Sequence, residues 1–244
     1  MKVSTLKQIL LITDGCSNQG MDPAAMAALA REQGITVNVI GVVENDSIDE
    51  QGMKEIEAIA SAGGGVSQVV YAQSLSQTVQ MVTRKAMTTT IQGVVNKELT
   101  QILGKSTSIE DLPPDKRGEV IEVVDELSET SELQVLVLVD TSASMKHKLP
   151  TVKESLIDLS ISLNARIGRN KFSVFIFPGK KHDVEKLLDW TPRLESLTKI
   201  FSKLTPRGIT PTGPAINEAI QYFEKKRSLR GLLGNDDEQY EDTV

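Results

Sequence analysis

Cysteine is nearly absent from this chain, since Cys16 is the only one among 244 residues. A single cysteine excludes an internal disulfide framework and any zinc site built from several cysteines, and it fits a reducing compartment. The first residues form no apolar segment of signal-peptide length, and no window of the sequence is long and apolar enough to cross a membrane. We therefore expect a cytoplasmic protein that has no membrane partner.

An excess of basic residues is also lacking: 27 lysines and arginines stand against 33 aspartates and glutamates, for a net charge of −6. This balance argues against nucleic acid or an anionic membrane surface as the main partner. Histidine is limited to His147 and His182, and no Gly-x-Ser-x-Gly sequence is present, so a Ser–His hydrolase fits poorly. No general base and nucleophile occur together, and we expect no catalytic residues.

The most informative stretch is residues 135–144, Val-Leu-Val-Leu-Val-Asp-Thr-Ser-Ala-Ser. Five consecutive aliphatic residues predict a strand buried on both faces, which is typical of a central parallel strand. The run stops at Asp140, and Ser142 and Ser144 follow, so three hard oxygens meet at the carboxyl end of the strand, where open α/β sheets bind ligands. Oxygen clusters of this kind suit Mg²⁺, Mn²⁺ or Ca²⁺ rather than zinc or copper.

The rest of the chain alternates short aliphatic or β-branched runs with stretches of helical periodicity. The predicted strands cover residues 9–13, 36–43, 67–72, 135–139, 172–177 and 184–190, with the last as an antiparallel edge. The predicted helices cover residues 22–33, 53–60, 75–103, 119–129, 149–167, 194–204 and 214–227. We expect an α/β fold: a doubly wound, mostly parallel six-stranded sheet with helices on both faces.

Three separate motifs resemble those of the von Willebrand factor A, or integrin I-domain-like, family. Asp140 to Ser144 match its Asp-x-Ser-x-Ser signature, Thr210 in Gly208–Ile216 matches its threonine loop, and Ile12–Gly15 match its strand ending in Thr-Asp-Gly. In the family these three segments form the metal-ion-dependent adhesion site (MIDAS). One such motif is a weak signal, whereas three at strand ends or in a loop are specific.

The resemblance implies a role for each residue. Ser142 and Ser144 would ligate Mg²⁺ or Mn²⁺ directly, and Thr210 would do so directly or through a water. Asp140 and Asp14 would hold the coordinating waters. The open position would accept a Glu or Asp of a partner protein, so the resemblance implies a non-enzymatic, metal-dependent protein-interaction module.

Simpler roles for the same residues stay open at this point. Ser142 and Ser144 could cap the helix that follows them, which is a common role of serine. Asp14 could be a turn aspartate before a glycine. Thr212, two positions after Thr210, is expected to be a contact at the start of a helix.

The order of the motifs differs from that of the family, in which Thr-Asp-Gly comes last. Residues 6–103 resemble the C-terminal half of such a domain and residues 133–227 its N-terminal half, with 104–131 as a joining linker. We therefore expect one circularly permuted domain over residues 1–230, with strand order 6-5-4-1-2-3 along this chain. Residues 231–244 hold five acids and little to pack, which predicts a disordered tail.

Two other functions compete with the interaction module. A metal-assisted hydrolase could use the same cation as a Lewis acid on phosphoesters. A domain-swapped scaffold dimer could share the site between two chains, so the chain is expected to be a monomer or a swapped dimer.

Overall fold

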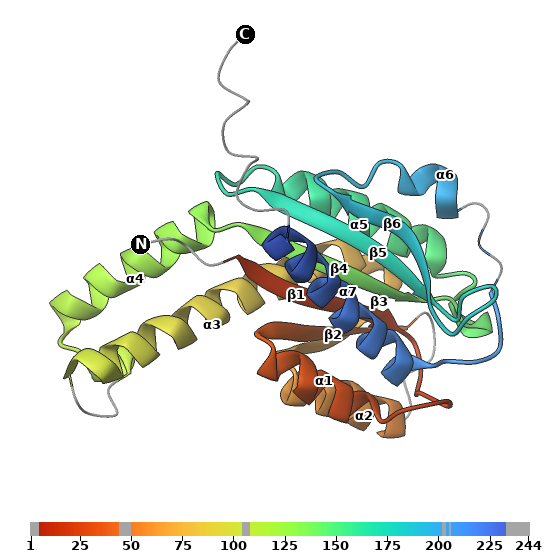
Figure 1. Cartoon of the computed structure of the whole chain (residues 1–244), viewed down its shortest axis with the longest axis horizontal. Coiled ribbons are helices and arrows are strands. Elements are labelled where there is room, and N and C mark those ends of the chain that lie inside the picture. Colours follow the sequence, from red (N-terminus) through yellow and green to blue (C-terminus); the bar gives the residue numbers. More distant parts are fainter. Residues whose placement is uncertain (1–4, 44–49, 104–107, 202–203, 205, 233–244) are drawn as a thin grey trace, which may run out of the picture.

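The computed structural model describes residues 5–43, 50–103, 108–201, 204 and 206–232, and these form a six-stranded sheet between two layers of helices (Figure 1). The strands are β1 (Leu6–Thr13), β2 (Ile35–Val43), β3 (Gly64–Tyr71), β4 (Leu133–Asp140), β5 (Asn170–Phe177) and β6 (Glu185–Thr191). Their order is β3-β2-β1-β4-β5-β6, with all neighbours parallel except β5 and β6. The predicted fold class and strand order are confirmed.

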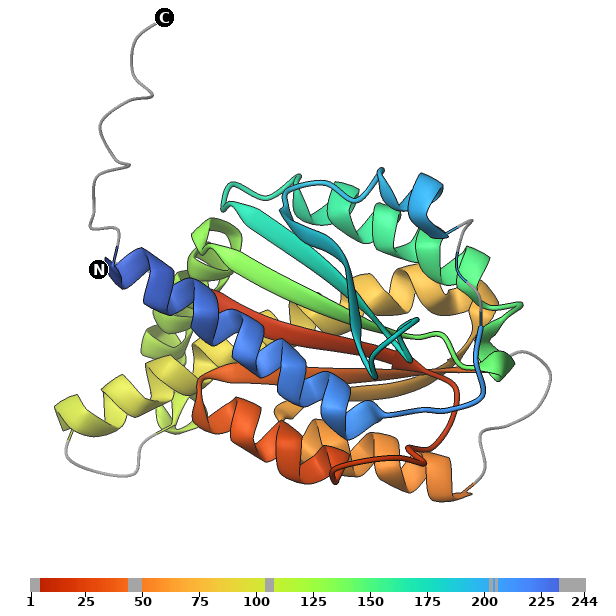
Figure 2. The ribbon, with the colours of Figure 1, turned by 45° about the vertical axis from the view of Figure 1, so that its right-hand side comes forward.

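The helices divide between the two faces of the sheet. They are α1 (Pro23–Glu32), α2 (Glu50–Ala62), α3 (Leu75–Leu103), α4 (Pro114–Thr130), α5 (Leu149–Leu163), α6 (Leu197–Phe201) and α7 (Thr212–Leu232). Figure 2 shows α7 and α1 in front of the sheet, with α3 and α5 behind it. None of the described helices has an apolar stretch long enough to span a membrane.

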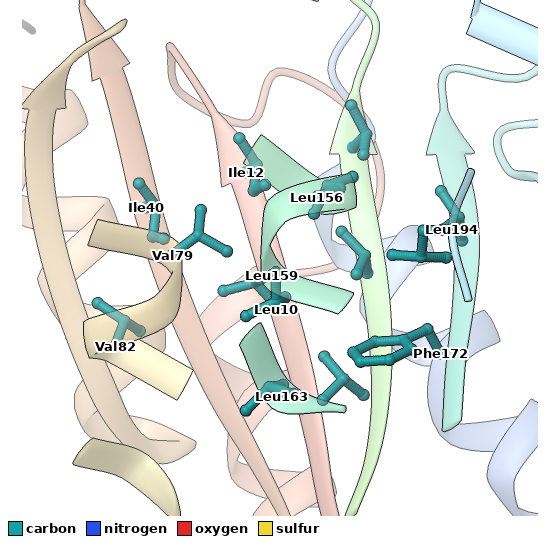
Figure 3. Close-up of a cluster of buried hydrophobic side chains, with 14 of the residues drawn as sticks. Leu10, Ile12, Ile40, Val79, Val82, Leu156, Leu159, Leu163, Phe172 and Leu194 are labelled. Carbon is teal, nitrogen blue, oxygen red and sulfur yellow. The ribbon is translucent and has the colours of Figure 1, made fainter. Parts of the chain in front are cut away.

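Each face of the sheet has its own apolar core. On the α3–α5 face, Leu10 and Ile12 of β1 pack with Val79 and Val82 of α3 and with Leu156 of α5 (Figure 3). On the other face, alternate residues of the same strands pack against α1, α2 and α7. The long aliphatic runs of β1 and β4 are thus explained, because residues pointing both ways are buried.

The two central strands start in register, and this places their ends side by side. Leu6 pairs with Leu133 and Ile12 with Val139, in parallel. Because strand direction is shared, the chain leaves both strands at the same edge of the sheet. That edge is where the predicted site residues follow β1 and β4.

The structure differs from the expected boundaries in several places: α5 ends at Leu163 and not at residue 167, α6 covers only Leu197–Phe201 of the expected 194–204, and β3, the linker and α7 differ as follows. β3 begins at Gly64 and not at Ser67, because a β-carbon at Gly65 would lie 2.1 Å from the carbonyl oxygen of Val37, so glycine lets the two strands approach. The expected linker contains a 3₁₀ turn, η2 (Ile109–Asp111), and the start of α4 at Pro114. α7 continues to Leu232, and the rest of the predicted tail, 233–244, lies outside the described residues.

Arg166 ties α4, which lies in the segment expected to join the two halves, to the sheet. Its guanidinium donates to the carbonyl oxygens of Ser128 and Ser131 and to Asn170 Oδ1. Arg166 is only 6% exposed. The C-terminal end of α4 is therefore fixed to the start of β5 by a buried cation with several acceptors.

Candidate metal centre

Asp140, the last residue of β4, is a fully buried carboxylate. Thr13, at the end of the neighbouring β1, donates from Oγ1 to Asp140 Oδ2 at 2.7 Å. The backbone N–H of Ser142 donates to Asp140 Oδ1, also at 2.7 Å. Both carboxylate oxygens are therefore fixed, one by each strand end.

Burial raises the pKa of Asp140 from its ordinary value of 3.8 to about 6, while the donors Thr13 and Ser142 act in the opposite direction. The carboxylate is thus costly to ionise in its present surroundings. A cation bound nearby would favour the ionised form, so Asp140 is chemically suited to support one.

Two serines connect Asp140 to Asp14, on the loop after β1. Ser142 Oγ lies 3.1 Å from Ser144 Oγ, and Ser144 Oγ donates to Asp14 Oδ1 at 2.8 Å, across 130 positions of sequence. Ser142 is buried, whereas Ser144 is exposed and leaves this side of the cluster open to solvent. Four of the predicted residues are thus brought together.

The serines do not act as simple side-chain helix caps. Ser142 precedes the 3₁₀ turn η3 (Ala143–Met145) but makes no side-chain capping hydrogen bond. Thr141, between Asp140 and Ser142, points away from them and donates to the carbonyl oxygens of Phe177 and Pro178.

The threonine loop is held against the loop that follows β1. Thr210 and Asn18 form two hydrogen bonds: Asn18 N–H donates to the Thr210 carbonyl at 3.2 Å, and Thr210 N–H donates to Asn18 Oδ1 at 2.8 Å. On its other side, Arg207 N–H donates to the carbonyl of Thr141 at 3.0 Å. Buried Thr210 therefore lies in a loop that bridges the ends of β1 and β4.

Thr212, at the start of α7, has the one buried side-chain oxygen that lacks a hydrogen-bond partner among the described residues. A buried hydroxyl without a partner carries the cost of its lost hydration. The predicted position at the helix start is found, but the hydroxyl is left available for a water or an ion.

The available donors are hard oxygens. No three His, Cys, Asp or Glu side chains are grouped to hold a metal in the part of the chain that the structure describes. The cluster instead combines two carboxylates, Asp14 and Asp140, with the hydroxyls of Ser142, Ser144 and Thr13. That donor set fits Mg²⁺ or Mn²⁺, which accept oxygen ligands and retain waters.

Comparison with known proteins decides the family. Two family models, both described as von Willebrand factor type A domain, match residues 2–85 and 135–239. The chain belongs to the von Willebrand factor A (vWA) family. vWA domains commonly bind a divalent metal at a MIDAS and are usually non-enzymatic.

Several proteins resemble this vWA chain. "Uncharacterized protein YabS" of Bacillus subtilis (strain 168) is 68% identical over 97% of each chain. A crystal structure of an uncharacterized protein from Alicyclobacillus acidocaldarius has 42% identity and a TM-score of 0.85, covering 93% of this chain and 97% of that one. Proximal thread matrix protein 1 from the mussel byssus, with a zinc-occupied MIDAS motif, has 17% identity and a TM-score of 0.25, covering 84% of this chain and 43% of that one. This last likeness is too small to bear on the metal or function of this chain.

The sequence patterns did not point to three residues that lie at the candidate site. Asn18 holds the threonine loop, and Glu55 of α2 accepts from the N–H of Ser17 at 2.7 Å, with its pKa raised chiefly by burial. Lys148 forms an ion pair with Asp14, with Nζ 2.5 Å from Oδ2. No local sequence pattern marks Lys148, because its partner Asp14 lies 134 positions away.

Proposed function

We propose that this vWA domain is a metal-dependent protein-interaction module without catalytic activity. Mg²⁺ or Mn²⁺ is held by Ser142, Ser144 and Thr210, with Asp140 and Asp14 orienting its waters. The observation that supports this most strongly is the hydrogen-bonded path from Asp140 through Ser142 and Ser144 to Asp14, in which the last step joins two segments that are 130 positions apart in the sequence.

The partner presents a glutamate or aspartate to the cation. A metal bound mostly through neutral hydroxyls and waters keeps much of its positive charge, and so it gains from one further anionic ligand. The exposed position of Ser144 gives such a carboxylate a route to the site. The bound cation supplies charge for recognition, and no bond of the partner is broken.

A groove next to the site would receive the residues that flank this acid. It has a volume of about 250 Å³ and lies between the start of α5 and α6, with Leu149 and Phe201 among its lining residues. Lys146 and Lys153 also line it. An apolar groove bordered by two lysines suits a segment with an apolar side chain and acidic neighbours.

We further infer that the unpartnered Thr212 hydroxyl contacts the cation or one of its waters, which predicts opposite effects of Thr212→Val on stability and on metal binding. Removing an unpartnered hydroxyl leaves the metal-free protein as stable as before, or more stable by up to about 1 kcal/mol. The stabilisation by Mg²⁺ becomes smaller, because the hydroxyl no longer serves the ion or its water. Chemical unfolding with EDTA and with Mg²⁺ measures both effects.

Thr83→Val is the matched control. Thr83 is fully buried, and its Oγ1 donates to the Val79 carbonyl at 2.8 Å. Thr83→Val should lower the free energy of unfolding by about 1 kcal/mol and leave the stabilisation by Mg²⁺ unchanged. Equal stabilisation of Thr212→Val and wild type by Mg²⁺ would show that Thr212 takes no part in metal binding.

Ser142→Ala tests the central claim. Calorimetric titration with Mn²⁺ is expected to show one site in the wild type and at least about tenfold weaker binding in the variant, because a direct ligand is lost. A partner is then captured from cell extract with Mg²⁺, with EDTA, and with Ser142→Ala. The proposal requires that changing one acid of the identified partner to its amide abolishes binding; Mg²⁺-independent binding contradicts it.

The competing functions have separate tests. A phosphoester hydrolase requires a free general base, yet Asp140 is fully buried with both oxygens accepting hydrogen bonds, and Asp14 accepts one from Ser144. Turnover of phosphoesters with Mg²⁺ or Mn²⁺ that is lost in Ser142→Ala would favour that function. Mass measurement in solution separates a monomer from a swapped dimer.

The domain organisation is likewise a proposal. We infer that residues 6–103 and 133–227 are the C-terminal and N-terminal halves of a circularly permuted vWA domain, joined through 104–131, in a unit spanning 1–230. The observed strand order, which the permutation predicted, supports it.

A further inference from the structure

An ammonium group of the protein itself lies at the candidate metal centre. Lys148 Nζ is 2.5 Å from Asp14 Oδ2, and the lysine and aspartate side chains are only 12% and 3% exposed. The other oxygen of Asp14 accepts from Ser144 at 2.8 Å. Asp14 therefore has no free oxygen, and the ion pair is largely shielded from water.

The ion pair completes the network that a metal would enter. Asp140 is held by Thr13 and the Ser142 N–H, while Ser142, Ser144 and Asp14 form one continuous chain. Lys148 ends this chain with a positive charge, next to the carboxylate that borders Ser144. A carboxylate this buried requires a counter-charge, and Lys148 provides it.

Lys148 is also held in place by its backbone. Its N–H donates to the carbonyl of Met145 at 2.9 Å, and its own carbonyl accepts from Val152 at the start of α5. The ammonium is thus tethered beside Asp14, where it acts at a high effective concentration. A divalent cation that approaches Asp14 and Ser144 meets both this competitor and its electrostatic repulsion.

We propose that Lys148 is a built-in competitor of the metal, which occupies Asp14 until a divalent cation displaces it. This inference rests on the proposed metal-binding function and adds its regulation. In the lysine-bound state Asp14 is paired and the site lacks its cation. In the metal-bound state Lys148 leaves Asp14 for solvent, and partner binding becomes possible. Lys148 therefore sets the metal concentration at which the module is active.

Lys148→Met tests this inference, because methionine keeps an unbranched apolar side chain and removes the charge. Mn²⁺ is titrated calorimetrically into the wild type, Lys148→Met and Lys146→Met at one ionic strength. We expect Lys148→Met to bind Mn²⁺ about ten- to hundredfold more tightly than the wild type. Lys146→Met removes the same charge from an exposed position two residues away and should change the affinity less than about threefold.

A second measurement uses the wild type alone and does not depend on the folding of a variant. Lysine acylation by an amine-reactive reagent is followed by mass spectrometry in EDTA and in saturating Mg²⁺. Lys148 is expected to react at least about fivefold faster with Mg²⁺, because it leaves a buried ion pair, while Lys146 reacts equally in both. Protection of Lys148 that is identical in both conditions overturns the proposal.

The outcomes separate the two proposals. Equal Mn²⁺ affinities of wild type and Lys148→Met, both sensitive to Ser142→Ala, overturn competition by Lys148 and leave the metal site standing. Absence of Mn²⁺ binding in the wild type and in Lys148→Met overturns both. Tighter binding in Lys148→Met together with metal-dependent exposure of Lys148 supports both.

Discussion

Asp140→Asn is expected to produce a protein that is as stable as the wild type in EDTA, or more stable, and that has lost its stabilisation by Mg²⁺. Burial holds the pKa of Asp140 at about 6, so at neutral pH the folded protein carries a carboxylate that is costly to keep ionised. Asparagine removes that charge at nearly constant volume. The size of the pKa shift implies that the free energy of unfolding rises by roughly 1–3 kcal/mol.

The surrounding donors can accept an asparagine without leaving a polar group unpaired. The Ser142 N–H that now donates to Asp140 Oδ1 can donate to the amide oxygen. Thr13 Oγ1, which lies 3.3 Å from the Gly15 carbonyl, can donate there and accept from the amide nitrogen. The variant therefore removes the charge while retaining the hydrogen bonds.

The stability difference between Asp140→Asn and the wild type depends on pH. The pKa of Asp140 in the folded protein is about 6, above the ordinary 3.8. Between these values the unfolded chain releases its proton and the folded protein keeps it, so wild-type stability in EDTA falls as pH rises from about 4 to 6. The advantage of Asp140→Asn should be full above about pH 6 and absent below about pH 4.

Denaturant unfolding of both proteins, with EDTA and with Mg²⁺, provides the measurement. The wild type should gain about 2.7 kcal/mol when the metal is at a hundred times its dissociation constant, and the variant should gain nothing. A full Mg²⁺ response in Asp140→Asn would show that the cation binds elsewhere. A variant that is strongly destabilised in EDTA would show that the ionised carboxylate, and not its amide, is needed for folding.

The central strands were predictable from sequence, because a strand that is buried on both faces is apolar at consecutive positions. Uninterrupted aliphatic residues mark β1 and β4, and each run ends where an acid or hydroxyl appears. Since parallel neighbours end at one edge, the meeting of Asp14 with Ser144 followed from the strand order. The metal role of these residues stays a prediction.

The remaining parts depended on contacts that no local pattern specifies. Residues 114–118 contain a proline and mixed charge, a composition that predicts a linker, yet they form the first turn of α4, with Pro114 at a favoured first helical position. Lys148 resembles any solvated lysine in the sequence; its approach to Asp14 depends on the turn η3, which directs the chain back over the end of β1. Asn18 lies in a loop, where only the neighbouring threonine loop reveals its role.

Gly213→Ala should damage both the fold and the metal site. A β-carbon at Gly213 would lie 1.9 Å from the carbonyl oxygen of Met21, in the loop that also carries Asp14 and Asn18. Backbone atoms cannot rotate away as a side chain can, so the start of α7 and this loop must separate. We expect the free energy of unfolding to fall by about 1–3 kcal/mol.

The metal site should weaken for the same reason. Thr210 lies three residues before Gly213 and is held to Asn18 by two hydrogen bonds, so a shift between the loops moves Thr210 relative to Asp14. Mn²⁺ affinity is expected to fall by at least about tenfold, since site residues displaced by an ångström lose most of their effect. Calorimetric titration of the folded variant, at a temperature well below its unfolding midpoint, separates this effect from instability.

Gly208→Ala, in the threonine loop just before α7, provides the matched control. A β-carbon there meets nothing within 4 Å, so the substitution should leave stability within about 0.5 kcal/mol and leave Mn²⁺ binding unchanged. Alanine also has a higher helix propensity than glycine by about 1 kcal/mol, which would favour Gly213→Ala inside α7. A destabilised Gly213→Ala can therefore be attributed to the close approach of Met21, whereas a stabilised one would mean that the two loops yield easily and that their separation does not control the site.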